Sequence, residues 1–235
     1  MITEPVLTAR PEGGVDVPVL VWRFAEPLLA ISSAVLGGGI VTCGWVVNAT
    51  VPMSYDRGDP DRHLGEIAAY LGLPGPGVGL LTAVDVADVV AADEDGVRLW
   101  ATVGLGAPIQ AAAPIQAGPS AAGPSAAKAA AQPPGTVNLV AWVPVPLGVG
   151  ALVNAVATLT EAKTQAIRDL GLAATGTATD AVCVLCPVDG PVAEYGGPRS
   201  TWGERLARAA YRAVLDGGRV NLAGIQSWSE RQGRQ

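Results

Sequence analysis

The chain has few of the residues from which metal sites and nucleophilic triads are usually built. Its 235 residues include one histidine and three cysteines. A single histidine excludes a zinc site made of several imidazoles, and it excludes a Ser-His-Asp triad unless His63 takes part. Three cysteines do not form a disulfide framework in a chain of this length. Cys183 and Cys186 lie three residues apart in an expected strand, so their sulfurs should face opposite ways into the core.

Charge is also scarce, and it is acidic on balance. Charged residues make up 15% of the sequence and hydrophobic residues 49%, with a formal net charge of −6. This composition excludes disorder for most of the chain and predicts a large buried core. Acidic residues interrupt the one basic cluster, at 199–219, so we expect no nucleic-acid partner.

Neither a signal peptide nor a membrane span is expected. The first residues lack basic and apolar regions, and no stretch of 18 uninterrupted apolar residues occurs. The expected location is therefore the cytoplasm, with no membrane partner.

Apolar periodicity and turn residues predict a single α/β domain over 1–235, with a mixed β-sheet flanked by helices. The clearest expected strands lie at 15–22, 28–35, 40–51, 97–105, 137–144 and 178–186. Helices are expected at 59–72, 150–170 and 201–216, with Gly217-Gly218 ending the last one. Residues 219–235 are expected to form a loose polar tail.

Two features qualify this organisation. Residues 107–134 are almost entirely Ala, Pro, Gly, Ser and Gln, which predicts a flexible surface loop. Segments 33–48 and 145–154 both run apolar, then Gly-rich, then Val-Asn, and each precedes a helix that ends in Leu-Gly-Leu. The repeat allows two pseudo-symmetric α/β halves meeting at a cleft, although unequal spacings leave chance open.

From residue 135 onward, short polar and Gly-rich motifs follow one another in a fixed order. They are Gly135-Thr136-Val137-Asn138, Gly150-Ala151-Leu152-Val153-Asn154-Ala155-Val156, Thr160-Glu161-Ala162-Lys163-Thr164-Gln165-Ala166, Ala174-Thr175-Gly176-Thr177-Ala178-Thr179-Asp180-Ala181 and Tyr195-Gly196-Gly197-Pro198. Together with Ser32-Ser33-Ala34, Val47-Asn48, Tyr55-Asp56 and Ala101-Thr102-Val103-Gly104-Leu105, the series resembles the adenosylcobinamide amidohydrolase family over about 28–216. The chain departs from the family at Ala107-Pro108, where Asn-Pro is frequent, and in the long loop that follows.

The resemblance implies a reaction. Members of the family hydrolyse the amide between the aminopropanol arm and the corrin ring of adenosylcobinamide, which yields adenosylcobyric acid and 1-amino-2-propanol in cobinamide salvage. The expected partner is thus a small-molecule corrinoid that carries its own cobalt, with no further cofactor or metal. A homo-oligomer stays open. The alternatives are a related amide hydrolase with another substrate and a corrinoid-binding protein without activity.

Three residues are candidates for catalysis: Glu161, Lys163 and Asp180. Lys163 falls near the apolar stripe of the 150–170 helix, where a lysine either pairs with a buried carboxylate or extends its ammonium group outward to solvent. An ion-pair or catalytic role is the functional interpretation. Asp180 stands at the mouth of an apolar strand and is either a general base or a turn cap. Glu161 shares the opposite helix face with Asn154, and that face either lines a cleft or is solvated.

Candidates for substrate binding are Ser33, Asn48, Asn138, Asn154 and Thr177. Their hydroxyl and amide groups suit the amides of a corrin, but each could instead satisfy local backbone. His63 is expected on the solvated side of its helix, beside Asp61 and Arg62. Gly135-Thr136 raises one sharper idea, self-cleavage that frees Thr136 as an N-terminal nucleophile.

Overall fold

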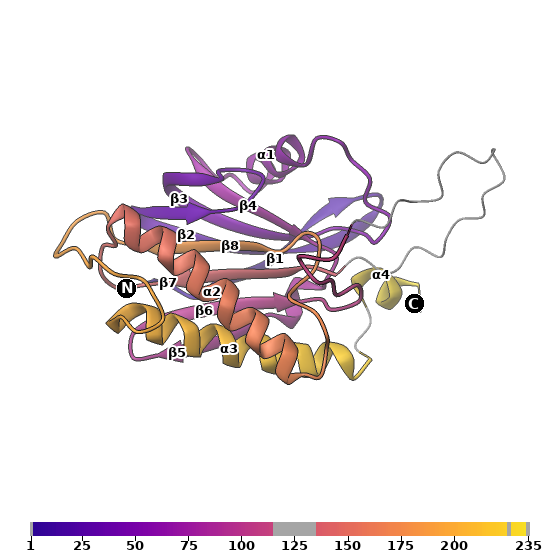
Figure 1. The fold of residues 1–235 in the computed structure, drawn as a ribbon. Helices are drawn as coiled ribbons and strands as arrows, with labels where there is room; N and C mark the ends of the chain where they lie inside the picture. Colours follow the sequence, from indigo (N-terminus) through magenta and orange to yellow (C-terminus); the bar gives the residue numbers. More distant parts are fainter. Residues whose placement is uncertain (1, 115–134, 225–226, 234–235) are drawn as a thin grey trace.

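One mixed sheet organises the molecule. The computed structural model describes residues 2–114, 135–224 and 227–233 (Figure 1). Its strands are β1 Val6–Glu12, β2 Val15–Ser32, β3 Gly39–Thr50, β4 Gly77–Thr82, β5 Val90–Glu94, β6 Val97–Val103, β7 Val137–Trp142 and β8 Ala181–Cys186. The helices are α1 Pro60–Tyr70, α2 Val149–Asp169, α3 Thr201–Leu222 and α4 Trp228–Gln232, with a short 3₁₀ turn at Val86–Asp88. The predicted α/β class, a mixed sheet flanked by helices, is confirmed.

The two halves of the sheet repeat one order of elements. The strand order is β4-β3-β2-β8-β7-β6-β5, with β1 added to β2. β3 pairs antiparallel with β2 and parallel with β4, and β7 pairs antiparallel with β6 and parallel with β8. A helix connects each parallel pair, α1 in the first half and α2 in the second. The sequence repeat had aligned Asn48 with Asn154, but Asn48 lies in β3 and Asn154 in α2.

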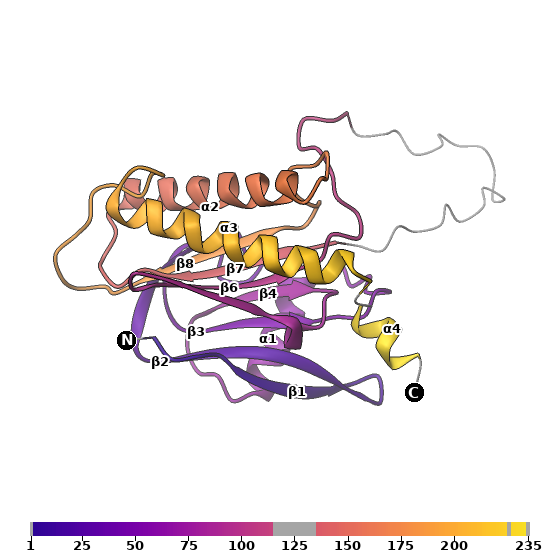
Figure 2. The ribbon, with the colours of Figure 1, turned by 90° about the horizontal axis from the view of Figure 1, so that it is seen from below.

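The sheet curls so that its two halves face each other across an inner core. Leu20, Val46 and Leu80 of the first half share one buried cluster with Val140 and Leu185 of the second. Figure 2 shows β1, β2 and β3 on the side of β6, β7 and β8 that faces away from α2 and α3. Strands that are not neighbours in the sheet therefore touch through their inward side chains.

Helices cover the outer faces of the curl. Because side chains alternate along a strand, Val47 and Ala49 of β3 point outward, where they meet Leu64 and Ile67 of α1. On the other side α2 and α3 pack against β6, β7 and β8 in the largest cluster, which includes Leu159 (Figure 1). None of the helices in the described part of the chain is long and apolar enough to cross a membrane.

Two element boundaries differ from prediction. β2 is one strand from Val15 to Ser32, not two, and a register shift between Arg23 and Leu28 absorbs the Glu26-Pro27 interruption. α3 continues through Gly217 and Gly218 to Leu222. A Cβ at Gly217 would lie 2.8 Å from Cγ2 of Val103, and one at Gly218 would clash with Leu170. These glycines allow close packing of the helix and do not end it.

The segment after residue 219 is also more ordered than the loose tail that we predicted. Its described residues continue α3 and then form α4, in which Trp228 is buried. Arg231 pairs with Asp85 and Asp88, which attaches α4 to the turn after β4.

The predicted surface loop is described only in part, because residues 115–134 lie outside the described residues. The N–H groups of Ile109 and Ala111 donate to the carbonyl of Gly176 and the hydroxyl of Thr175, so residues 107–114 run beside the turn before β8.

Candidate functional site

A cavity of about 450 Å³ opens where the curl brings strand ends from both halves together. The carboxyl ends of β3 and β4 meet the amino ends of β7 and β8, which are not their neighbours in the sheet. The segment after β2 bridges the remaining gap, because Ser33 bonds to Val182 of β8 and Leu36 to Gly79 of β4. The lining residues are Ser33, Ala34, Val35, Val51, Pro52, Met53, Tyr55, Pro60, Leu80, Leu81, Thr82, Ala83, Thr136, Thr179, Asp180 and Ala181. Most of the wall is apolar, with hydroxyl groups and one carboxylate on the side of β7 and β8.

A buried amide network lies beneath the cavity. Nδ2 of Asn138 donates to Oδ1 of Asn48 and to the carbonyl of Leu81, each over 3.0 Å. Nδ2 of Asn48 in turn donates to the hydroxyl of Thr102 over 3.0 Å. Oδ1 of Asn138 has no hydrogen-bond partner among the described residues. The sequence grouped Asn48 and Asn138 as substrate-binding candidates; the structure joins them, but as the support of the strand ends and not in the cavity wall.

An ion pair stands behind the polar side of the cavity. Lys163 of α2 reaches inward and pairs with Asp180, and the two side chains are 8% and 11% exposed. Oδ1 of Asp180 also accepts from the N–H of Val137 at 2.8 Å and the hydroxyl of Thr177 at 2.5 Å, and Oδ2 accepts from the N–H of Thr177 at 3.0 Å. Of the two alternatives left open for Lys163, the structure shows the pairing with a buried carboxylate. Asp180 thus holds the start of β7 and the turn before β8 in one arrangement.

Two hydroxyl groups form the corner of the cavity next to this pair. Oγ1 of Thr136 lies 2.6 Å from Oγ1 of Thr179, and Oγ1 of Thr179 lies 3.2 Å from the carbonyl oxygen of Gly135. Thr136 is buried, and both threonines line the cavity. On the wall formed by the segment after β2, Oγ of Ser33 accepts from the N–H of Val182 at 3.0 Å. The corner therefore offers hydroxyl groups beside a neutralised charge pair.

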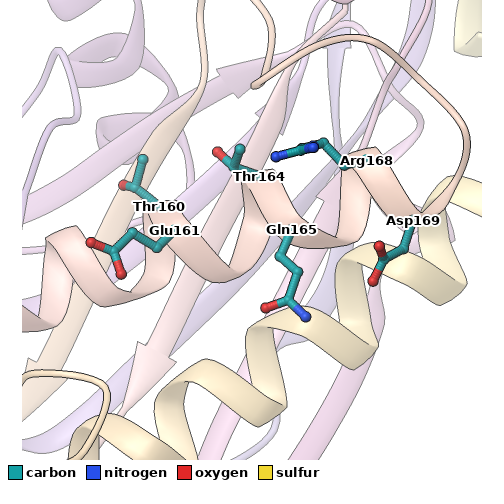
Figure 3. A pocket seen from close by; sticks show the side chains of 6 residues that line it. All are labelled: Thr160, Glu161, Thr164, Gln165, Arg168 and Asp169. Carbon is teal, nitrogen blue, oxygen red and sulfur yellow. The ribbon is translucent and has the colours of Figure 1, made fainter.

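Glu161 and Asn154 lie apart from this cavity. Both are exposed on the outer face of α2. Figure 3 shows Glu161 with the other side chains that line a separate pocket on this face: Thr160, Glu161, Thr164, Gln165, Arg168 and Asp169. Of the eight candidates, the structure places Ser33 and Asp180 in the cavity wall, Lys163 and Thr177 behind Asp180, and Asn48 and Asn138 beneath.

His63 is buried, which corrects its expected solvated position. Nδ1 of His63 lies 3.1 Å from the hydroxyl of Tyr55, and Nε2 lies 3.4 Å from Oε1 of Glu12 on β1. Burial lowers the pKa of His63 and raises the pKa of Tyr55. The neutral tautomer with its hydrogen on Nε2 fits both contacts. Tyr55 also lines the cavity, but His63 does not.

The cysteines are core residues, as predicted. Cys183 and Cys186 belong to clusters on opposite faces of β8. Burial raises the pKa of Cys43 to about 12 and also raises the pKa of Cys183, so both stay protonated thiols. Within residues 2–114, 135–224 and 227–233, no three His, Cys, Asp or Glu side chains lie close enough together to hold a metal ion.

Sequence reasoning had not named Thr179 and Tyr55 as functional residues, although both occur in motifs that it used. Thr179 belongs to the hydroxyl-rich run before β8, and Tyr55 to the Tyr55-Asp56 pair. Thr179 lies next to Asp180, just before the start of β8, so its place in the sequence was a usable signal. Tyr55 gave no such signal, because it lies in an irregular segment between β3 and α1.

The family model and two relatives that match this chain carry the same description. The family model described as adenosylcobinamide amidohydrolase matches residues 5–224. An adenosylcobinamide amidohydrolase of Methanosarcina mazei is 28% identical over 191 residues, which are 77% of this chain and 86% of that protein. Another, from Halobacterium salinarum, is 41% identical over 124 residues, which are 51% of this chain and 50% of that protein.

Proposed function

This chain belongs to the adenosylcobinamide amidohydrolase family, and we propose that it hydrolyses the amide between the aminopropanol arm and the corrin ring of adenosylcobinamide. The products are adenosylcobyric acid and 1-amino-2-propanol. The proposal includes a role in cobinamide salvage and a cytoplasmic location.

The observation that carries the proposal is the cavity with its apolar wall and hydroxyl-bearing corner. Its volume of about 450 Å³ is within the usual range of small-molecule sites and would take the aminopropanol arm with the adjoining edge of the corrin. Apolar side chains such as Val35, Met53 and Leu80 suit the ring edge and its methyl groups. The polar corner would then lie beside the scissile amide.

Amide hydrolysis needs a nucleophile, donors for the developing oxyanion and a proton for the leaving amine. Thr136, Thr179 and Ser33 supply hydroxyl groups on the cavity wall. We assign Lys163 and Asp180 as positioning residues, because Asp180 binds the N–H of Val137 and so fixes the residue that follows Thr136. Glu161 and Asn154 have no part in this proposal, because they are exposed on α2 and do not line the cavity.

The deciding experiment incubates the purified protein with adenosylcobinamide and separates the products by chromatography. We expect adenosylcobyric acid and 1-amino-2-propanol in equal amounts. Thr136→Val should abolish turnover, whereas Asn154→Ala, on the exposed face of α2, should leave it unchanged. Tight binding of adenosylcobinamide without release of the amine would indicate a corrinoid-binding protein. Turnover of small amides alone would indicate a different substrate.

A further inference from the structure

One hydroxyl group of the cavity corner contacts both a candidate nucleophile and the peptide bond just before it. Oγ1 of Thr179 lies 2.6 Å from Oγ1 of Thr136 and donates to the carbonyl oxygen of Gly135 at 3.2 Å. A donor at that oxygen polarises the Gly135–Thr136 peptide and would stabilise negative charge on it. The neighbouring hydroxyl of Thr136 belongs to the residue on the amine side of the same bond.

The backbone on both sides of this bond is held in place. A Cβ at Gly135 would lie 2.6 Å from the carbonyl oxygen of Gly104 and 3.0 Å from Cγ2 of Thr177, so only glycine fits there. On the other side, the carbonyl of Thr136 accepts from the N–H of Gly104 at 2.9 Å, and the N–H of Val137 donates to Asp180 at 2.8 Å. Thr136 would therefore keep its place at the start of β7 if the bond before it were cut.

The cavity has nucleophilic hydroxyl groups but little to activate them. Asp180 is its one carboxylate among the described residues, and that carboxylate already accepts from Lys163, Val137 and Thr177. His63 does not line the cavity. A free α-amine on Thr136 would supply the missing base. An α-amino group has an ordinary pKa of about 7.7–8.0, close enough to neutral pH for part of it to be unprotonated, and it lies beside its own side chain.

We propose that the chain cleaves itself between Gly135 and Thr136, and that Thr136 then acts as an N-terminal nucleophile. In the first step Oγ1 of Thr136 attacks the carbonyl carbon of Gly135, the C–N bond breaks, and the hydroxyl proton passes to the departing nitrogen. This yields an ester and a free α-amine. Water then attacks the ester, the C–Oγ1 bond breaks, and Gly135 becomes a carboxylate while Thr136 regains its hydroxyl. One water molecule is consumed.

The second role rests on the proposed function. The α-amine of Thr136 takes the proton from Oγ1 as that oxygen attacks the substrate amide, and passes it to the leaving aminopropanol nitrogen. The corrinoid acyl ester on Thr136 is then hydrolysed by water to give the carboxylic acid. Thr179, which stabilises the carbonyl oxygen of Gly135 during maturation, would be placed to do the same for the substrate.

The mass of the purified full-length chain under denaturing conditions tests the inference. We expect two polypeptides, 1–135 and 136–235, whose masses sum to that of the intact chain plus one water, with Thr136 as the N-terminus of the second. Thr136→Ser should still cleave and Thr136→Val should not. Thr179→Val should slow cleavage by about 100-fold, as loss of one oxyanion donor typically does. Thr160→Val, which changes an exposed threonine of α2, is the matched control and should cleave normally.

Circular dichroism and thermal unfolding of each variant separate loss of chemistry from loss of fold, and the conservative Thr136→Ser variant keeps the test meaningful if Thr136→Val is unstable. An intact wild-type chain overturns the inference, whether or not it turns over adenosylcobinamide. Cleavage of Thr136→Val at the wild-type rate also overturns it. A cleaved chain that does not hydrolyse adenosylcobinamide supports self-cleavage and instead contradicts the proposed function.

Discussion

Replacement of Lys163 by methionine tests how the ion pair behind the cavity contributes to stability. Methionine has a similar length and no charge, so it removes the ammonium group with little change in packing. Asp180 would then keep its three other donors, the N–H of Val137 and the N–H and hydroxyl of Thr177. Asp180→Asn is the complementary change. Its amide NH₂ would face the ammonium of Lys163 and the N–H of Thr177, which leaves donors without an acceptor.

The structure sets the order and size of the two effects. Removal of one partner from a buried pair costs about 3–5 kcal/mol, because the other charge stays desolvated. The side chains are 8% and 11% exposed, so that range applies. Lys163→Met should fall near the lower end, about 3 kcal/mol, since three donors still satisfy the carboxylate. Asp180→Asn should approach about 5 kcal/mol, because the buried ammonium then has no counter-charge.

Urea unfolding followed by circular dichroism measures both changes, and the double variant Lys163→Met/Asp180→Asn should lose less than the sum of the two. In a chain of this size, losses of about 3 to 5 kcal/mol would lower the midpoint temperature of thermal unfolding by about 6 to 20 °C. Arg168→Met, on the exposed side of the same helix, is the control and should cost at most about 1 kcal/mol. Single variants within about 0.5 kcal/mol of wild type would show that the pair is no more than a surface contact and would refute this reasoning.

Three further predictions follow from buried groups elsewhere. Gly217→Ala should destabilise the protein because its Cβ would lie 2.8 Å from Cγ2 and 3.1 Å from Cβ of the buried Val103. Gly65→Ala in α1, with no atom within 4 Å of the new Cβ, should instead stabilise it by about 0.5–1 kcal/mol; thermal unfolding compares the two. The folded-state pKa of His63 lies below its ordinary value of about 6.5, so the unfolded chain binds its proton first, and His63 should contribute a loss of stability as pH falls below about 6.5. Urea unfolding of His63→Gln between about pH 5 and about pH 7 should lack that contribution. An unchanged pH dependence would place the titration elsewhere. Asn138→Ala should cost about 1–3 kcal/mol for each acceptor left unpaired, on Asn48 and at the carbonyl of Leu81, and a loss below about 0.5 kcal/mol would contradict the network.

Local patterns predicted the elements that local forces determine. Pro60 begins α1, and α2 runs from Val149 to Asp169, each within a few residues of the expected helix. The opposite orientation of Cys183 and Cys186 followed from the period of a strand. The inward direction of Lys163 followed from the helical period of α2. In each case residues only a few positions apart decide the outcome.

Predictions failed where a distant segment decides. His63 was expected in solvent because Asp61 and Arg62 precede it. It is instead buried next to Glu12, which lies 51 positions away in β1 and contacts Nε2 of the imidazole. Gly217 and Gly218 have the usual signature of a helix end, yet α3 continues through them, because Val103 and Leu170 pack closely against the helix at these positions. Glu161 lies two residues from Lys163, about 200° around the helix, so membership of one motif did not bring both to one site.

At the candidate site, neighbouring residues decide one part of the geometry and a distant segment decides the rest, both within the single strand β7. Alternation places Asn138 and Val140 on one face of β7, and Thr136, the residue before the strand, continues that face. Only the curl of the sheet makes that face the inner one and sets the carboxyl ends of β3 and β4 against it, where Asn138 bonds to Asn48 and Leu81. The amide of Asn138 bonds to Asn48 beneath the cavity, and the residue two positions earlier, Thr136, is the first side chain of that face to reach the cavity wall. The position of Thr136 in the cavity is therefore a consequence of strand period combined with the meeting of two halves.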